Sequence, residues 1–178
     1  MQLIKRYLDP GAVVNFTQLG HRHTAIEYAI AGIAENYQVN LERLGSDPLT
    51  RAMEGSMREW VVETLFQGAY LREYHLWEKD CKAYFGAMAK RNGCELALRT
   101  KGGQTFTKLI EDMLAAFDVA MPVETMLAIE AMRQRVNVMK HEAGLELDHF
   151  ISTSEYADAI YALEKFWEFL ATREKLTG

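Results

Sequence analysis

One long helical pattern, from about residue 49 to residue 88, constrains the fold of this chain of 178 residues more than any other feature. Its apolar residues form a drifting stripe at helical spacing: Trp60, Val61, Phe66, Tyr70, Tyr74, Trp77, Cys81 and Tyr84. Gly55 and Gly68 fall inside the pattern. Each glycine weakens a helix by about 1 kcal/mol relative to alanine, so the pattern allows a kink or a break near either of them. The segment predicts one long helix.

Four further stretches also place apolar residues at helical spacing. They are residues 23–44, 104–120 and 121–140, where Pro122 suits a first turn, and a last helix that opens with the capping box Ser152-x-x-Glu155. Turn sequences separate them: GSDP at 45–48, RNG at 91–93, KGG at 101–103 and the loop HEAGLELDHF at 141–150. No segment reads as a β-strand. We therefore predict an all-α fold, an up-and-down helical bundle of about five or six helices, one of them long and open to a kink.

Two of these helices have well-defined candidate core faces. In the segment 121–140 the face consists of Met126, Leu127, Ile129, Met132, Val136 and Met139. In the last helix it consists of Tyr156, Ile160, Leu163, Trp167 and Leu170. Both sets recur with the helical period, so we expect both to be buried.

The composition is that of a soluble globular protein, with 49% hydrophobic and 25% charged residues. Residues 1–20 carry DPG at 9–11 and no sustained period, so we expect an irregular N-terminal arm followed by a single helical domain over residues 21–178. The chain has neither a signal-type start nor an apolar run of about 18 residues. These features predict a cytoplasmic protein that does not contact a membrane.

The net charge of −5 is unevenly distributed. The segment from Lys79 to Lys108 contains seven basic and two acidic residues, and the rest of the chain is correspondingly acidic. A solvated face between helices is the ordinary explanation of such a run. Contact with phosphate is the alternative, because screening makes local charge matter more than distant charge.

Residue spacing argues against several kinds of catalytic site. A carboxylate-bridged metal site in a helix bundle needs two Glu-x-x-His pairs, and the chain has one, Glu146 with His149, in a predicted loop. The sequence HRH at 21–23 has no obvious third ligand. Cys81 and Cys94 form no CxxC pair and have no local histidine partner. We therefore expect no metal, no cofactor and no cysteine nucleophile.

The stretch RQRVNVMKHEAG, residues 133–144, concentrates polar residues at a predicted helix end. Asn137 and His141 are four residues apart and share a helix face, whereas Arg135 lies about 120° round from His141. A histidine at a helix C-terminus is stabilised as its cation, and an arginine can fork onto a phosphate. These residue types suit phosphodiester cleavage. The alternative is that the basic residues are ordinary surface residues of the last turn and that Asn137 and His141 help to cap it.

The pattern RVNVMKHEAG resembles the Arg-x(4–6)-His motif of the HEPN superfamily, all-helical domains that often act as RNases in toxin–antitoxin, phage-defence and RNA-processing systems. Arg135 and His141 have five residues between them, and the stretch also resembles an Asn-x-x-Lys-His-x-x-Gly version of the motif. The upstream stretch REYHLWEKDCKAYF, 72–85, is similar to the aromatic-rich earlier helix of that family. The likeness in helix order covers about residues 60–170.

The resemblance implies metal-independent cleavage of RNA. His141 would act as general acid or base and Arg135 would stabilise charge on the phosphate, with Asn137 orienting either group. Lys140 would add a phosphate contact, and Glu78 or Asp80 would face His141. Members of the family usually pair their motif helices across a two-fold axis, so the resemblance also implies a homodimer, with RNA as substrate and an antitoxin or other protein as partner.

One position departs from the family pattern. Active RNases of the family commonly have a polar residue directly after the arginine, but here Val136 occupies that position and Asn137 follows it. The superfamily also contains non-catalytic members that bind nucleotides, RNA or proteins. A non-enzymatic helical protein that dimerises or binds a partner, with a degenerate motif, is therefore the alternative to an RNase.

Overall fold

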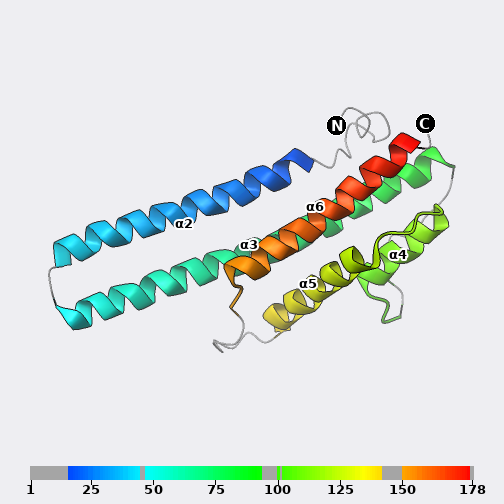
Figure 1. The fold of residues 1–178 in the computed structure, drawn as a ribbon. Coiled ribbons are helices and arrows are strands. Elements are labelled where there is room, and N and C mark those ends of the chain that lie inside the picture. The colour runs from blue at the N-terminus through cyan, green and yellow to red at the C-terminus, as the bar shows by residue number, and fades with distance from the viewer. Residues whose placement is uncertain (1–15, 45–46, 94–99, 101, 142–149, 177–178) are drawn as a thin grey trace.

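The computed structural model describes residues 16–44, 47–93, 100, 102–141 and 150–176, and this part of the chain is helical and contains no strand. The helices are α2 (Phe16–Leu44), α3 (Pro48–Arg91), α4 (Phe106–Ala116), α5 (Val123–His141) and α6 (Thr153–Leu176). In Figure 1, α2 and α3 form a long hairpin, α6 lies along it, and α5 and α4 cover the remaining side of α3. The prediction of an all-α helical bundle is confirmed.

The long helix predicted over residues 49–88 is α3, which runs unbroken through both Gly55 and Gly68. The Asp47 side chain caps its start by accepting a hydrogen bond from the Thr50 amide at 2.9 Å, and Pro48 occupies the first turn. Gly93, with φ of 66°, follows its C-terminal end in the left-handed conformation expected from the RNG turn.

The first helix is longer than predicted. It begins at Phe16 rather than near His23, so the last residues of the predicted irregular arm are helical. Residues 1–15 lie outside the described residues. Ile26 and Ile30 of α2 pack partly buried against the core.

The shorter helix α4 ends at Ala116, before the predicted limit of residue 120, because the chain turns sharply there. Asp118 has a φ of 56°, the amide of Val119 donates to the Leu114 carbonyl at 2.9 Å, and the amide of Asp118 donates to the Ala115 carbonyl at 3.0 Å. This is a Schellman-type C-cap in which aspartate occupies the position that glycine usually takes. Without a glycine, the sequence does not signal the turn.

Ser152 caps the start of the last helix, as its place in the predicted capping box requires. The Glu155 amide donates to the Ser152 hydroxyl at 3.1 Å, and the Tyr156 amide donates to the Ser152 carbonyl at 2.9 Å. All five residues of the predicted core face of α6 are buried: Tyr156, Ile160, Leu163, Trp167 and Leu170. The sequence therefore predicts both the start of α6 and the face that packs.

The core is built around aromatic side chains from α3, α4 and α6. Trp77 lies at its centre, with its ring 5.6 Å from Phe106 and 5.4 Å from Phe166, in both cases near-perpendicular. Edge-to-face pairs of this kind add to the stabilisation that burial provides. Trp77 thus ties three helices together.

The N-terminal half of α3 lies outside this core. Phe66 is the first buried side chain of the helix, although the predicted apolar stripe begins at Trp60. Trp60 and Val61 are exposed, so the predicted apolar stripe is not buried along its whole length. Figure 1 shows the reason: the distal half of the hairpin extends beyond the other helices, and only α2 lies against it.

Candidate functional site

Helix α5 contains the predicted motif residues, and its side chains face three neighbouring helices and solvent. Met126, Ile129, Met132 and Val136 are buried as predicted and Met139 is partly buried, but Leu127 is 64% exposed and is a wrong core prediction. Val123, Leu127, Ala131, Gln134 and His141 lie on the outward face with partly buried Val138. Because α5 contacts α3, α4 and α6, its motif residues reach different neighbours according to their position round the helix.

Arg135 connects α5 to the beginning of α6. Its Nε donates to Glu155 Oε1 at 3.1 Å, and its Nη2 donates to the carbonyl of Phe150 at 2.8 Å. A cavity of about 560 Å³ lies beside it and is also lined by Tyr70 and Asp158. Burial, and then the negative charge of Glu155, raise the pKa of the Tyr70 hydroxyl. The guanidinium therefore has a structural role in addition to any chemical one.

Asn137 lies on the other side of α5, in a second cavity of about 520 Å³. This cavity is lined by Glu78, Lys82, Arg133 and Lys140 among others. The structure therefore brings together three of the predicted residues: Asn137, Lys140 and Glu78. Arg135 lines the cavity beside Tyr70 instead, so within one chain the predicted site is divided between two faces of α5.

The other two predicted residues line neither cavity. His141 is exposed at the C-terminal end of α5, and Asp80 is half-buried on α3. Glu78 is close to His75, with Oε2 3.3 Å from Nδ1. The position of His141 makes it accessible to a ligand or to a second chain.

Val136 separates the two faces. Its side chain has no exposed surface and lies in the core between the cavities lined by Arg135 and Asn137. The residue directly after Arg135 thus points into the core, and a polar side chain there would be buried. This placement explains physically why the residue is apolar in this chain.

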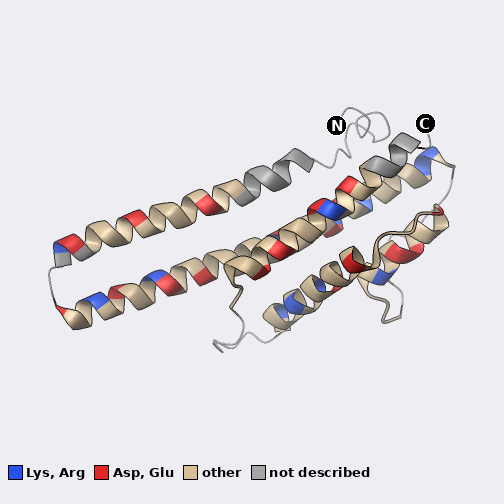
Figure 2. Ribbon diagram, viewed as in Figure 1, with Lys and Arg blue, Asp and Glu red and all other residues tan. Residues whose placement is uncertain are grey.

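Arg133 is the basic residue of the motif stretch with the strongest ion pair. Its Nε and Nη2 donate to both carboxylate oxygens of Glu130, at 2.8 and 2.7 Å. These hydrogen bonds hold the pKa of Glu130 below its ordinary value of 4.5. In Figure 2, basic residues lie toward the C-terminal end of α5. With Arg133 paired, Lys82 and Lys140 are the lysines that this cavity offers to an anion.

The Glu130–Arg133 pair predicts an acid-dependent loss of stability. Because the folded state lowers the pKa of Glu130, its contribution is present above pH 4.5 and is lost as the pH falls through the folded-state pKa. The loss of unfolding free energy on acidification should be at most about 1 kcal/mol for this pair, and we expect Glu130→Gln to abolish it. Urea unfolding between neutral and acid pH measures it. Arg133→Met should flatten the profile in the same way, and an unchanged profile in both variants would contradict the assignment.

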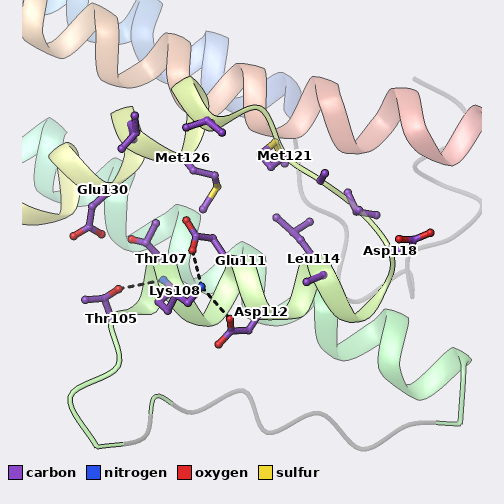
Figure 3. A pocket seen from close by; sticks show the side chains of 15 residues that line it. Thr105, Thr107, Lys108, Glu111, Asp112, Leu114, Asp118, Met121, Met126 and Glu130 are labelled. Carbon is purple, nitrogen blue, oxygen red and sulfur yellow. Dashed lines mark hydrogen bonds and ion pairs between the residues drawn. The ribbon is translucent and has the colours of Figure 1, made fainter.

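A further cavity, of about 680 Å³, lies between α4 and α5 and was not predicted from the sequence. In Figure 3, Leu114, Met121 and Met126 form its apolar floor, and carboxylates stand at its rim. The Lys108 ammonium is paired with Glu111 at 3.1 Å and with Asp112 at 3.3 Å.

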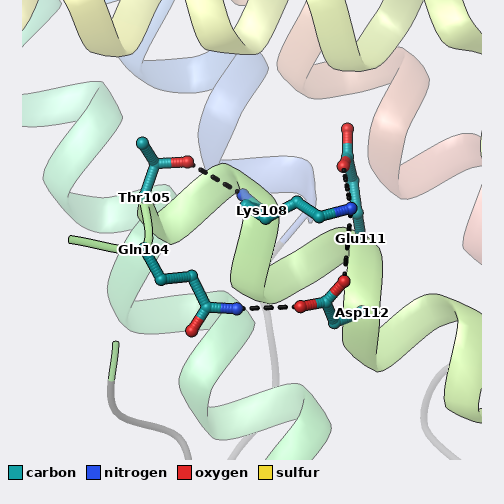
Figure 4. Close-up of polar contacts among 5 residues, drawn as sticks. All are labelled: Gln104, Thr105, Lys108, Glu111 and Asp112. Atoms are coloured by element: carbon teal, nitrogen blue, oxygen red, sulfur yellow. Dashed lines mark hydrogen bonds and ion pairs between the residues drawn. The ribbon is translucent and has the colours of Figure 1, made fainter. Parts of the chain in front are cut away.

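The rim of this cavity is held by local polar contacts (Figure 4). Gln104 Nε2 donates to Asp112 Oδ2 at 2.8 Å, and the Thr105 hydroxyl accepts from the Lys108 amide at 3.1 Å and so caps α4. The cavity is walled by the turn at Asp118, which the sequence does not signal. No motif in the sequence points to it.

The described residues show no arrangement typical of metal or thiol chemistry. Within the described side chains, no three histidines, cysteines or carboxylates lie close enough to hold a metal ion. The side chains of residues 21–23, Cys94, Glu146 and His149 lie outside the part described. Cys81 is fully buried, and burial raises the pKa of its thiol, which disfavours the reactive thiolate. No helix in the described ranges combines the length and apolarity that a membrane span requires.

Comparisons of the chain with protein-family models, with curated proteins and with solved structures find no match.

Proposed function

We propose that this chain is a HEPN-like helical protein that cleaves RNA without a metal, in a toxin–antitoxin or phage-defence setting. His141 would be the acid or base and Arg135 the group that stabilises the phosphate, with Asn137 orienting them. The single observation that carries the proposal is the position of His141: it is exposed at the C-terminus of α5, where a substrate can reach its imidazole.

The division of the motif between two faces of α5 favours a site made by two chains. The outward face of α5 carries Val123 and Leu127 in its first turns and His141 at its end. Arg135 and Asn137 flank this face on opposite sides, beside different cavities. Pairing of two such faces about a two-fold axis would let Arg135 of one copy approach His141 of the other. In that arrangement Arg135 and His141 of the same chain do not need to meet.

The cavity that contains Asn137 supports an anionic substrate. Lys82 and Lys140 line it, and both side chains are exposed. Glu78 provides a carboxylate in the same cavity. Two exposed lysine side chains in one cavity suit the phosphate backbone of RNA, although the Lys82 ammonium lies 5.0 Å from the centre of the Phe106 ring, and Glu78 could hold a hydroxyl or accept a proton there.

Cleavage of structured and unstructured RNA by the purified chain, with and without EDTA, tests the proposal. We expect EDTA-resistant cleavage that falls by about 10²–10⁴-fold in His141→Ala and by about 10²-fold or more in Arg135→Ala. Because Arg135 also holds Glu155, the matched control is Glu155→Gln, which weakens the same contact but keeps the guanidinium. Helical content by circular dichroism shows that each variant is folded.

Two outcomes would contradict the proposal. One is an absence of cleavage by a folded, dimeric wild-type protein. The other is cleavage that persists in His141→Ala at the wild-type rate. If Glu155→Gln loses as much activity as Arg135→Ala, Arg135 positions α6 rather than acting on the phosphate.

A non-catalytic helical dimer or partner-binding protein is the second candidate function. The observation in its favour is that Arg135 is already bound to Glu155 and to the Phe150 carbonyl, which reduces its availability to a phosphate. RNA binding without cleavage, or stable capture of a partner protein through the outward face of α5, would favour this candidate. The cleavage assay separates the two.

A further inference from the structure

The distal part of α3 carries an exposed apolar surface that is distinct from the motif helix. Its members share one side of the helix and point away from α2: Leu49, Met53, Met57 and Trp60, each 57–70% exposed, with Val61 at the edge. Their spacing of four, four and three residues follows the helical period. We call these five residues the α3 stripe.

The opposite side of the same segment is fully used by the hairpin. Glu54 accepts a hydrogen bond from Asn40 at 2.9 Å, and the Arg58 guanidinium lies 5.0 Å from the centre of the Tyr37 ring. Gly55 also faces α2, since a Cβ there would lie 3.5 Å from the Tyr37 hydroxyl, an ordinary contact distance. The α3 stripe is therefore not a face that α2 could cover by a small shift.

We propose that the α3 stripe is covered by the α3 stripe of a second copy of this chain, so that two hairpins form a four-helix bundle about a two-fold axis. The extent of the surface supports this occupant. Five side chains with these exposures present on the order of 500 Å² of apolar surface per copy, which is most of the roughly 800 Å² that each partner buries in a standard interface.

The charges beside the stripe favour an antiparallel pairing. Glu59 and Glu63 lie on one flank, and the charge of Glu59 raises the pKa of Glu63 after the effect of burial. In an antiparallel pair centred near Gly55, the same flanks of the two copies lie side by side but run in opposite directions. Glu59 and Glu63 of one copy then lie beside the first turns of the other α3 and not beside its Glu59 and Glu63, so the four carboxylates stay apart.

Light scattering and sedimentation of the full chain over a wide range of concentration test this pairing. We expect the wild-type protein to associate into particles of at least twice the 20.3 kDa of one chain. The double variant Met53→Glu, Met57→Glu should weaken association on the order of a hundredfold. Glutamate is a good helix former and both positions are exposed, so helical content should not change.

Leu127→Glu is the matched control because it introduces the same charge at an equally exposed apolar position on α5. It should leave the pairing through the α3 stripe intact, whereas it would break a pairing through α5. A monomeric wild-type protein would overturn the proposal, and so would association that the double variant does not weaken. RNA cleavage is read separately, so failure of this interface and failure of the proposed activity give different results.

Discussion

Trp77→Ala is expected to lower the free energy of unfolding by about 3–5 kcal/mol, the range for removing a fully buried tryptophan. The side chain is 2% exposed, and its ring contacts Phe106 of α4 and Phe166 of α6. Because the helices on either side are held by other contacts, the structure cannot close the cavity completely. Urea or thermal unfolding followed by circular dichroism measures the change.

The matched control for Trp77→Ala is Tyr161→Ala. Tyr161 is also an aromatic residue within a helix, but it is 60% exposed and contacts the Lys165 ammonium at the surface. We expect its replacement to change the unfolding free energy by less than about 1 kcal/mol. A similar loss in both variants would mean that Trp77 is not the centre of the core.

Val136→Asn, which places a polar residue directly after Arg135 as in active HEPN RNases, is expected to destabilise the protein by about 2–4 kcal/mol. The Val136 side chain has no exposed surface, and an amide there would lose its hydrogen bonds to water within the core. We therefore expect the change to weaken the fold, as seen in the urea midpoint, and not to raise RNA cleavage.

Val138→Asn provides the comparison for this prediction. Val138 lies two residues further along α5, is partly exposed and lines the cavity beside Arg135, so an amide there can keep contact with water. Its expected cost is below about 1 kcal/mol. If Val136→Asn were as stable as Val138→Asn and cleaved RNA faster, Val136 would face the site rather than the core.

Helix periodicity predicts most of this fold because apolar residues at helical spacing mark the faces that pack. The core face of α6 and the start of α6 at Ser152 are confirmed, and α3 begins one residue before and ends three residues after the predicted long helix. The pattern cannot show where along α3 its neighbours end. Trp60 continues the stripe of Trp77, yet the hairpin leaves it without a covering helix.

The candidate site was less predictable because it depends on which neighbour each face of α5 meets. Spacing places Asn137 and Arg135 on different sides, but it does not reveal that Glu155 binds Arg135 or that Lys82 shares a cavity with Asn137. These contacts join segments far apart in the sequence. The end of α4 was missed for another reason, since Asp118 takes a left-handed conformation that usually signals glycine.

The single helix α3 combines two levels of local stability within one continuous rod. Beyond Phe66 its side chains are held by the core, so those amides exchange with solvent only when much of the protein opens. Before Phe66 the backbone of a single chain packs against α2 alone, so fewer contacts must break for this segment to open. A second copy seated on the α3 stripe would raise the local stability of this segment toward that of the rest of α3.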